Sequence, residues 1–354
     1  MTYFILGKDS YLDAQETYSN FLQDDNYIKL YRGSDLKTIA DIFNKEIPTN
    51  RPLQQYYREL SDEIYKIGCK SNAFINQHLT IQQYGHTDKS MFELKCIERT
   101  DSEIFEGIFE KLKMHIIENK NPQKKSVEPF KKNNVDFCEQ LKKIDNGHIE
   151  LISNLSPNEK ILIRDYYLAL LHRLYYRDFH KISPLLSTSE SKEETYHFLK
   201  SGQEKTHSII FEYMLPKDPD LLHIYAIPHT ITENAKIIQL LEKSSLPIIK
   251  EFPYKEQKEY SIKRRLFSHL MLSISFYDNE YGNDKPYTII NPSINNFNVE
   301  LGIFDINQET FFADIIKTNY CQYTEFLHED RIFHSQKISN DLPNNVEIFI
   351  FPDS

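Results

Sequence analysis

The sequence changes character near residue 180, and this change limits the possible folds more than any other feature. Between about residues 35 and 177, apolar residues recur at three- and four-residue steps, which predicts amphipathic helices. Three segments carry this spacing most clearly: 53–65, 103–114 and 161–174. After residue 180, short apolar runs end at Pro or at turn residues, which predicts strands. Helices followed by strands, without regular βαβ alternation, favour an α+β fold.

Local signals refine this outline. Ser156, Pro157 and Glu159 predict a helix start, with Ser at the cap and Pro at the first helical position. The stretch 118–132 is rich in Lys, Asn and Pro and predicts an exposed loop. The sequence also predicts strands at 27–33, 182–189, 208–215, 221–227, 254–262, 266–277 and 346–351. It predicts a short helix at 190–200 and an amphipathic segment at 235–246.

The composition is that of a globular protein with an acidic surface. Of the 354 residues, 40% are hydrophobic and 13% aromatic, enough for a sizeable core. The net charge of −10 provides no global basic field for nucleic acid or anionic membrane. With nine Gly and neither a G-x-G-x-x-G nor a Walker A run, the sequence argues against Rossmann and P-loop nucleotide sites.

The cysteines and the apolar segments indicate the cellular compartment in which the protein is expected. Cys69, Cys96, Cys138 and Cys321 lie far apart without a C-x-x-C pair, which favours reduced thiols. The start of the chain lacks a basic stretch followed by a long apolar run, and no apolar segment approaches the length of a membrane span. We therefore expect a cytoplasmic protein without a membrane partner.

Two common kinds of catalytic site find little support. Six histidines fall within one region, at positions 172, 180, 197, 207, 223 and 229. None forms an i, i+4 pair with an adjacent Glu and no Cys lies near, so we predict no metal. A Ser–His–Asp hydrolase stays possible in principle, but there is no G-x-S-x-G elbow.

Three short polar segments stand at or near predicted strand ends. They are Tyr31-Arg32-Gly33, Ser187-Thr188-Ser189 and Gln257-Lys258-Glu259. If residues 254–262 form a strand, side chains alternate between its faces, so Gln257 and Glu259 point the same way. Each segment also has an ordinary structural interpretation: a surface ion pair for the Arg, a turn or helix cap for the serines, and a solvated edge strand for Glu259.

Taken in order, these segments resemble the Arg–Ser–Glu class of ADP-ribosyltransferases. The segments that carry the resemblance are 30–33, 184–189, the Thr195-Tyr196-His197-Phe198 helix, 209–216 and 256–260. The stretch from 182 to about 277 follows the family order closely, and the aromatic-Arg-Gly start gives a weaker likeness to the bacterial FRG domain. The resemblance implies a split β-sandwich with a large helical insertion and a β-rich C-terminal extension. Its parts would be residues 1–34 (first core strands), 35–180 (insertion), 181–280 (catalytic core) and 281–354 (extension).

The resemblance also implies roles for individual residues, with NAD as the substrate and no metal. Glu259 would stabilise the oxocarbenium-like transition state, Ser187 would hold the Glu259 rotamer, and Gln257 would orient the nucleophile. Arg32, with Tyr31 and Gly33, would bind the pyrophosphate, and Arg173 and Arg177 are alternatives for this role. The remaining cofactor-binding residues would be Thr188 and Ser189, below the nicotinamide ribose, and Phe198 or Tyr196, stacked on the nicotinamide.

The function implied is mono-ADP-ribosyl transfer, a glycosyltransferase reaction, in a toxin or phage-defence context. An amide at Gln257 suits an amide or base edge, so a nucleic-acid acceptor is slightly favoured over a protein. Lys263-Arg264-Arg265 is a candidate guide for a nucleic-acid strand, although a solvated strand edge explains it as well. Two other functions stay open: an NAD glycohydrolase, and a non-catalytic interaction module that binds a partner such as an antitoxin or inhibitor protein.

Overall fold

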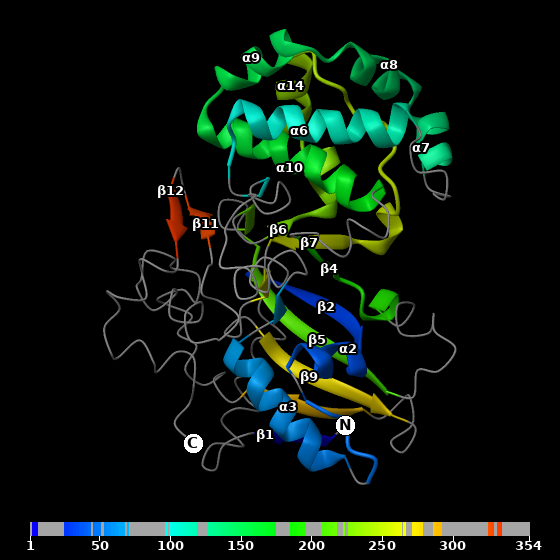
Figure 1. Ribbon diagram of the computed structural model, residues 1–354, viewed down its shortest axis with the longest axis vertical. Coiled ribbons are helices and arrows are strands. Elements are labelled where there is room, and N and C mark those ends of the chain that lie inside the picture. Colours follow the sequence, from blue (N-terminus) through cyan, green and yellow to red (C-terminus); the bar gives the residue numbers. More distant parts are fainter. Residues whose placement is uncertain are drawn as a thin grey trace, which may run out of the picture.

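The protein combines helices with a largely antiparallel sheet, which confirms the predicted α+β class (Figure 1). The computed structural model describes residues 2–5, 25–43, 45–50, 53–67, 69–70, 96–97, 99–118, 127–174, 185–195, 207–217, 222–223, 226–263, 265–266, 271–278, 286–291, 325–328 and 331–334.

Eight strands form the main sheet, in the order β1-β10-β9-β5-β2-β4-β7-β6. Their bounds are β1 Thr2–Ile5, β2 Tyr27–Asp35, β4 Leu185–Ser189, β5 His207–Pro216, β6 Ala226–Ile227, β7 Glu259–Lys263, β9 Met271–Asp278 and β10 Tyr287–Ile290. All neighbours run antiparallel except β1 and β10. Two small sheets pair β3 (Cys69–Lys70) with β8 (Arg265–Leu266), and β11 (Glu325–His328) with β12 (Arg331–His334).

The main sheet consists of two halves joined at β2 and β4. β2 pairs with β5 along its whole length, from Tyr27 to Asp35, but meets β4 at the single pair Tyr31 and Ser189. β4 then pairs with β7 over its full length. One registered pair connects the two halves, and Figure 1 shows β4, β6 and β7 above the β2, β5 and β9 strands.

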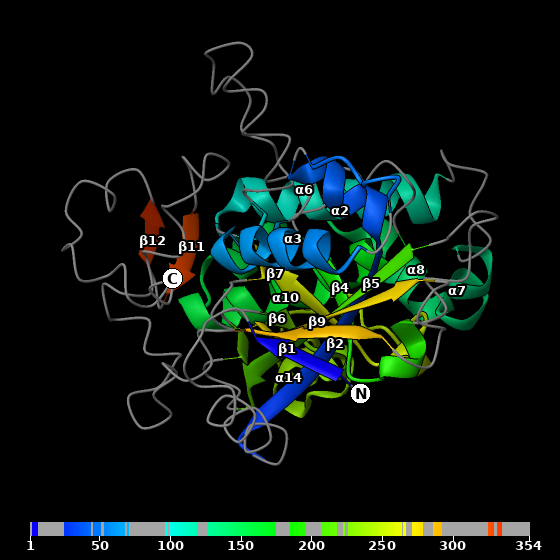
Figure 2. The same cartoon turned by 90° about the horizontal axis from the view of Figure 1, so that it is seen from below.

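One face of the sheet, called the first face here, packs against α2 (Leu36–Ile42) and α3 (Gln54–Ile67) (Figure 2). Alternate residues of the strands point into this core, among them Leu30, Phe211 and Phe276. Tyr57 of α3 stacks on Phe276 with ring centroids 4.3 Å apart. The first face is therefore filled by apolar and aromatic side chains.

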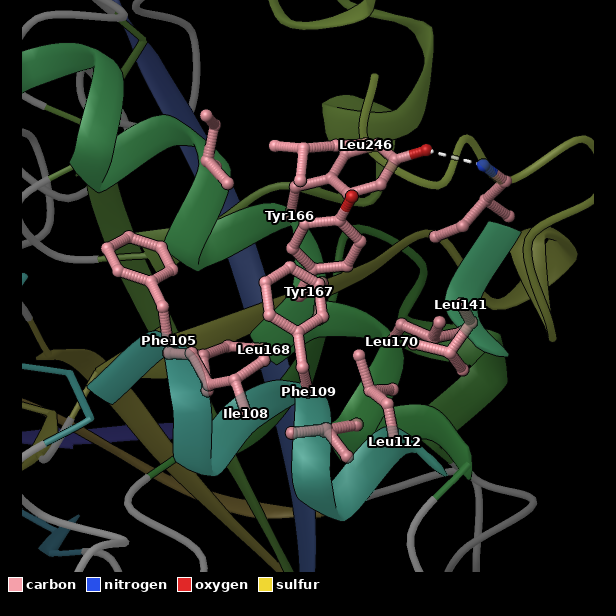
Figure 3. Close-up of a cluster of buried hydrophobic side chains, with 14 of the residues drawn as sticks. Phe105, Ile108, Phe109, Leu112, Leu141, Tyr166, Tyr167, Leu168, Leu170 and Leu246 are labelled. Carbon is pink, nitrogen blue, oxygen red and sulfur yellow. Dashed lines mark hydrogen bonds between the residues drawn. The ribbon is translucent and has the colours of Figure 1, made fainter. Parts of the chain in front are cut away.

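A layer of helices lies beyond β7 and β6 and contains a second core (Figure 1). It comprises α6 Ser102–Leu112, the π-helical turn η1 Lys113–Ile117, α7 Val127–Asn133, α8 Val135–Lys143, α9 Asn146–Ser153, α10 Pro157–Leu174, the 3₁₀ turn η2 His229–Glu233 and α14 Ala235–Lys243. α10 is its central helix, and 13 of its residues are buried, which explains the weak amphipathic signal of this segment. Figure 3 shows the Tyr167 ring of α10 against Phe109 of α6, with ring centroids 4.9 Å apart, and Tyr166 beside Leu246.

The predicted cap of α10 is present. The Ser156 hydroxyl and backbone N–H both donate to the Glu159 carboxylate, at 2.7 and 2.9 Å, and the Glu159 N–H donates back to the Ser156 hydroxyl at 3.4 Å. These bonds satisfy backbone groups that the first helical turn leaves without partners. The helix start predicted from residues 156–159 is therefore confirmed.

Tyr166→Phe is expected to lower the free energy of unfolding by about 1–3 kcal/mol, because it removes the acceptor of a buried backbone donor. The Ile249 N–H donates to the Tyr166 hydroxyl at 2.7 Å, and both residues are buried (Figure 3). Urea unfolding measures the loss. Tyr254→Phe, at a ring that is 43% exposed, is the matched control and should leave the midpoint unchanged. Equal midpoints for Tyr166→Phe and wild type would contradict the expectation.

Two expected elements are wrong in detail. The loop expected at 118–132 contains part of α7, whose Val127 and Phe130 are buried in the helical layer. The strand expected at 221–227 is reduced to the two residues of β6, preceded by helical residues at 222–223. The strand expected at 346–351 lies outside the described residues. Within the described part of 35–180, every element is helical except β3 and the last residue of β2, Asp35. None of the described helices has the length and apolar character that crossing a bilayer requires.

Candidate active site

Each of the three polar segments singled out in the sequence contributes residues to one of three neighbouring strands of the main sheet. Arg32 is on β2, Ser187-Thr188-Ser189 is on β4, and Glu259 begins β7. β4 lies between the other two, with Ser189 in register with Tyr31 on one side and with Glu259 on the other. Side chains opposite each other across strands share a face, so Tyr31, Ser189 and Glu259 point the same way. This is the second face of the sheet, opposite the α3 core.

Glu259 lies on the second face, beneath the C-terminal end of α10, and its side chain is 11% exposed. Its Oε1 atom contacts His172 Nε2 at 3.1 Å and accepts a hydrogen bond from the Ser261 hydroxyl at 3.0 Å. Its Oε2 atom has a longer contact, 3.5 Å, with Arg173 Nε. The carboxylate is therefore held mainly through one oxygen.

These contacts keep Glu259 ionised. Burial by itself raises the pKa of this carboxyl group, but the hydrogen bond and charge of His172, the charge of Arg173 and the hydrogen bond from Ser261 together lower the pKa to about 2. A carboxylate at this pKa carries its negative charge at neutral pH. It can stabilise positive charge that develops on a bound molecule, and it is a poor general acid.

The structure corrects the role expected for Ser187. Its hydroxyl lies 2.9 Å from His172 Nε2, and the hydroxyl that donates to Glu259 belongs to Ser261. Ser261 follows Glu259 by two positions on β7, so strand alternation places both side chains on one face. His172 thus lies between Ser187 and Glu259, a connection that the sequence analysis did not expect.

This geometry differs from a Ser–His–acid hydrolase. Both contacts of His172, to Ser187 Oγ and to Glu259 Oε1, use the same ring nitrogen. In a hydrolytic triad, one ring nitrogen meets the acid and the other accepts the serine proton. Because Glu259 is ionised, His172 Nε2 must carry a proton toward it and has no lone pair for activating Ser187. The arrangement does not make Ser187 a nucleophile.

The guanidinium beside Glu259 is that of Arg173, which was an alternative to Arg32. Burial lowers the pKa of Arg173, while Glu259 and Glu256 raise it. Arg173 Nη1 donates to the carbonyls of Pro253 and Tyr254, at 2.9 and 2.6 Å, and its guanidinium lies over the Phe252 ring, 4.9 Å from the centroid. The helix end is thereby fastened to the segment before β7.

Arg32 was expected to bind the NAD pyrophosphate, but it lies on the opposite face of the sheet from the Glu259 side chain, so the structure does not bring the two side chains together. It alternates with Tyr31 along β2 and shares the first face with Leu30. Its Nη1 donates to the backbone oxygen of Ser187 at 2.8 Å. Arg32 therefore contacts the backbone of the Ser-Thr-Ser strand, while the Ser187 and Glu259 side chains face α10.

Gln257 does not share a strand face with Glu259, so the predicted 254–262 strand is wrong over its first half. Residues Lys255–Gln257 form a 3₁₀ turn, η3, and β7 begins only at Glu259. Tyr254 and Lys258, which bracket the turn, both have left-handed backbones, with φ of 55° and 45°. This conformation breaks the two-residue alternation from which the shared face was predicted.

The other predicted residues have structural contacts or lie outside the described part. The Thr188 hydroxyl donates to Tyr260 O at 2.8 Å, and the Ser189 hydroxyl donates to Gln257 O at 2.7 Å, so both tie β4 to the β7 segment. Burial, and then a hydrogen bond and charge from Glu212, raise the pKa of Tyr31. Gly33 is in register with Ile210 of β5. The predicted residues outside the described part are Tyr196, Phe198 and the alternative Arg177.

A cavity of about 590 Å³ lies beside the site, between α7, η2 and the segment leading to β7. Its lining includes Phe130, Phe252 and Tyr254 together with Glu256, but not Glu259 or Ser187. Phe252 and Tyr254 also contact Arg173 near the end of α10, so the same two residues line the cavity and hold this helix end. Within the described residues, no group of three or more His, Cys, Asp or Glu side chains is placed to hold a metal ion.

Sequence reasoning missed His172 and Ser261 as members of the site. Ser261 could have been found, because a residue two positions from Glu259 on a strand must share its face. His172 was considered only as a metal ligand, and its role depends on how α10 packs across β7. A scan against protein-family models and searches of the curated proteins and of the solved structures find no match to this chain.

Proposed function

We propose that the protein transfers ADP-ribose from NAD⁺ to a macromolecular acceptor, with nucleic acid slightly favoured over protein, in a toxin or defence role. One observation carries the proposal: an ionised, largely buried carboxylate, Glu259, lies on the strand beside Ser-Thr-Ser, in register with Ser189 and connected to Ser187 through His172. The strand of Arg32 lies on the other side of Ser-Thr-Ser. The proposal includes a split β-sandwich fold, supported by the single pair joining β2 to β4. Residues 35–180 would be the helical insertion and residues 281–354 the extension.

In the proposed reaction, the bond between ribose C1′ and the nicotinamide nitrogen breaks, and its electron pair stays with the nicotinamide, which leaves neutral. The acceptor atom forms the new bond to C1′ and releases its proton to solvent. Positive charge develops on the ribose during this step, and Glu259 stabilises it. Oε1 is held by His172 and Ser261, so Oε2, with only the 3.5 Å contact to Arg173, is the oxygen oriented toward the ribose 2′-hydroxyl.

Because α10 covers Glu259, the ribose must approach along the edge where Arg173 meets Oε2. The charge of Arg173 then lies close to the NAD⁺ phosphates, a role first assigned to Arg32. NAD is the substrate in this scheme, and no metal takes part. An antitoxin or inhibitor protein would act by covering the same edge.

Glu259→Gln is expected to lower nicotinamide release from NAD⁺ by about 10²–10³-fold, since an amide cannot balance the charge of the transition state. The assay uses wild type, Glu259→Gln and the exposed control Glu242→Gln on α14, with folding checked by circular dichroism. Labelled NAD⁺ in lysate, followed by nuclease or protease digestion, identifies the polymer that carries ADP-ribose.

The outcomes separate the candidate functions. Label on a polymer supports transfer, whereas rapid nicotinamide release from NAD⁺ alone, without labelled polymer, supports the NAD glycohydrolase. Wild-type protein that releases no nicotinamide in lysate or alone contradicts both enzymes and leaves the interaction module. A Glu259→Gln variant that is folded and as active as Glu242→Gln would remove Glu259 from the site.

A further inference from the structure

We infer that His172 is a positioning residue for the proposed transfer: it donates one N–H to both Ser187 and Glu259 and so fixes which carboxylate oxygen meets the substrate. The inference rests on the proposed function, and it adds a residue and a role that the sequence resemblance does not supply. Its basis is geometric. His172 Nε2 lies 2.9 Å from Ser187 Oγ and 3.1 Å from Glu259 Oε1, and the ring is buried.

The helix that carries His172 is firmly anchored, which a positioning role requires. Tyr167 donates its hydroxyl proton to Pro247 O at 2.8 Å, and Tyr166 accepts from the Ile249 N–H. One residue after His172, Arg173 holds the carbonyls of Pro253 and Tyr254. Four hydrogen bonds from three residues of α10 thus fasten the helix to the 247–254 segment, so the imidazole has little freedom to move away from the carboxylate.

The donor direction follows from charge. A carboxylate ionised at neutral pH only accepts hydrogen bonds, so the proton between His172 and Glu259 is on Nε2. The same N–H is shared with Ser187 Oγ, which accepts it and retains its own hydroxyl proton for another partner. Both the neutral Nε2–H tautomer and the imidazolium provide this donor.

The consequence is an asymmetric carboxylate. Oε1 has the His172 and Ser261 donors, whereas Oε2 faces Arg173 at a distance longer than a normal hydrogen bond. With Oε1 fixed, the carboxylate cannot rotate to present it to the ribose. A displacement of about 1 Å at a reacting group can cost about 10²-fold in rate, which gives the scale of the effect.

The charged groups around His172 determine which ionisation a pH titration of the His172 variants will detect. On the sheet side it faces Glu259, and on α10 its neighbour is Arg173, whose charge also interacts with Glu256 and His229. About two helical turns earlier, Asp165 is paired with Arg164 and Lys263. Among the described residues, the Glu259 carboxylate contacts His172, at 3.1 Å, and we expect it to respond directly to a change there.

The test compares His172→Gln with His172→Asn. Both replace imidazole by an amide, but the Gln nitrogen reaches the place of Nε2 and the Asn nitrogen does not. We expect His172→Gln to keep kcat for nicotinamide release within about 5-fold of wild type and His172→Asn to lower kcat by about 10²-fold, with little change in KM for NAD⁺. The acid limb of the kcat–pH profile should move to higher pH in His172→Asn, because Glu259 loses a donor that favours its ionised form.

A second readout does not need activity. Carboxyl ¹³C NMR titration, with the Glu259 signal assigned from Glu259→Gln, should show a higher pKa for Glu259 in His172→Asn than in wild type or His172→Gln. If wild type releases no nicotinamide, the proposed function fails, and this titration still decides whether His172 controls Glu259. The inference is overturned if His172→Asn and His172→Gln have the same kcat and the same Glu259 pKa. A difference between the two variants in melting temperature alone would also overturn it, because it would show a purely structural role.

Discussion

Asp165→Asn is expected to lower the free energy of unfolding by about 3–5 kcal/mol, because it leaves two buried cations without their shared anion. Arg164 donates to Asp165 Oδ1 from Nε and Nη2, at 3.0 and 2.8 Å, and Lys263 Nζ donates to Oδ2 at 2.6 Å. All three side chains are buried. The bond to Lys263 joins α10 to β7, so it also holds the helix over Glu259. Urea unfolding monitored by circular dichroism measures the loss.

The pH dependence of the same variant provides a second measurement. Burial raises the pKa of Asp165, but Arg164 and Lys263 more than offset this and lower it below the ordinary value. A depressed folded-state pKa stabilises the protein above the unfolded pKa of about 3.9, and this contribution is lost as the pH falls through the folded pKa. Asp165→Asn should therefore lose less stability than wild type between about pH 4 and the acid end of the titration.

An exposed pair serves as the control for Asp165. Lys142 and Glu139 of α8 interact at 2.6 Å on the surface, and Glu139→Gln should give the wild-type urea midpoint, since exposed ion pairs contribute little. If Asp165→Asn and Glu139→Gln have the same urea midpoint, Arg164 and Lys263 form other interactions in the variant. The bond between Asp165 and Lys263 would then contribute little to the free energy of unfolding.

Local signals predicted the fold well where the deciding interactions are close in sequence. The capped start of α10 at Ser156 and the positions of β2 and β5 are examples, although each of these strands is two residues longer than predicted. The α+β class follows from the same periodicities. The order of the Arg32, Ser-Thr-Ser and Glu259 segments also suggested that they would meet, and their strands are adjacent.

The parts of the site that the sequence did not reveal depend on long-range contacts or on rare backbone conformations. Gln257 was assigned to a strand because no feature of the amino-acid sequence indicates that Tyr254 and Lys258 have a left-handed backbone conformation. Arg32 was expected to bind the NAD pyrophosphate, but its position on the first face, away from the Glu259 side chain, follows from the register of β2 with β5. That His172 would reach Glu259 required knowing how α10 crosses β7, a contact 87 positions apart.

Asn134→Ala is expected to lower the free energy of unfolding by about 2–4 kcal/mol, because four hydrogen bonds end on this one side chain. Asn134 Nδ2 donates to Phe130 O and Glu251 O, at 2.9 and 3.0 Å, and Oδ1 accepts from the N–H groups of Lys250 and Glu251, at 2.8 and 2.9 Å. The side chain is therefore fully used, and it clamps the segment before β7 to α7.

The Asn134 clamp acts on the site through that segment. Residues 253 and 254, just beyond it, supply the carbonyls that hold Arg173 Nη1, and Arg173 lies against Oε2 of Glu259. Hydrogen exchange should therefore speed up at the Lys250 and Glu251 amides in Asn134→Ala, because both lose their acceptor. Asn133→Ala, at the exposed neighbouring position, should leave both the unfolding midpoint and the exchange rates unchanged. If Asn134→Ala unfolds at the wild-type urea concentration with protected amides, the segment is held by other contacts, and Arg173 alone must anchor the end of α10.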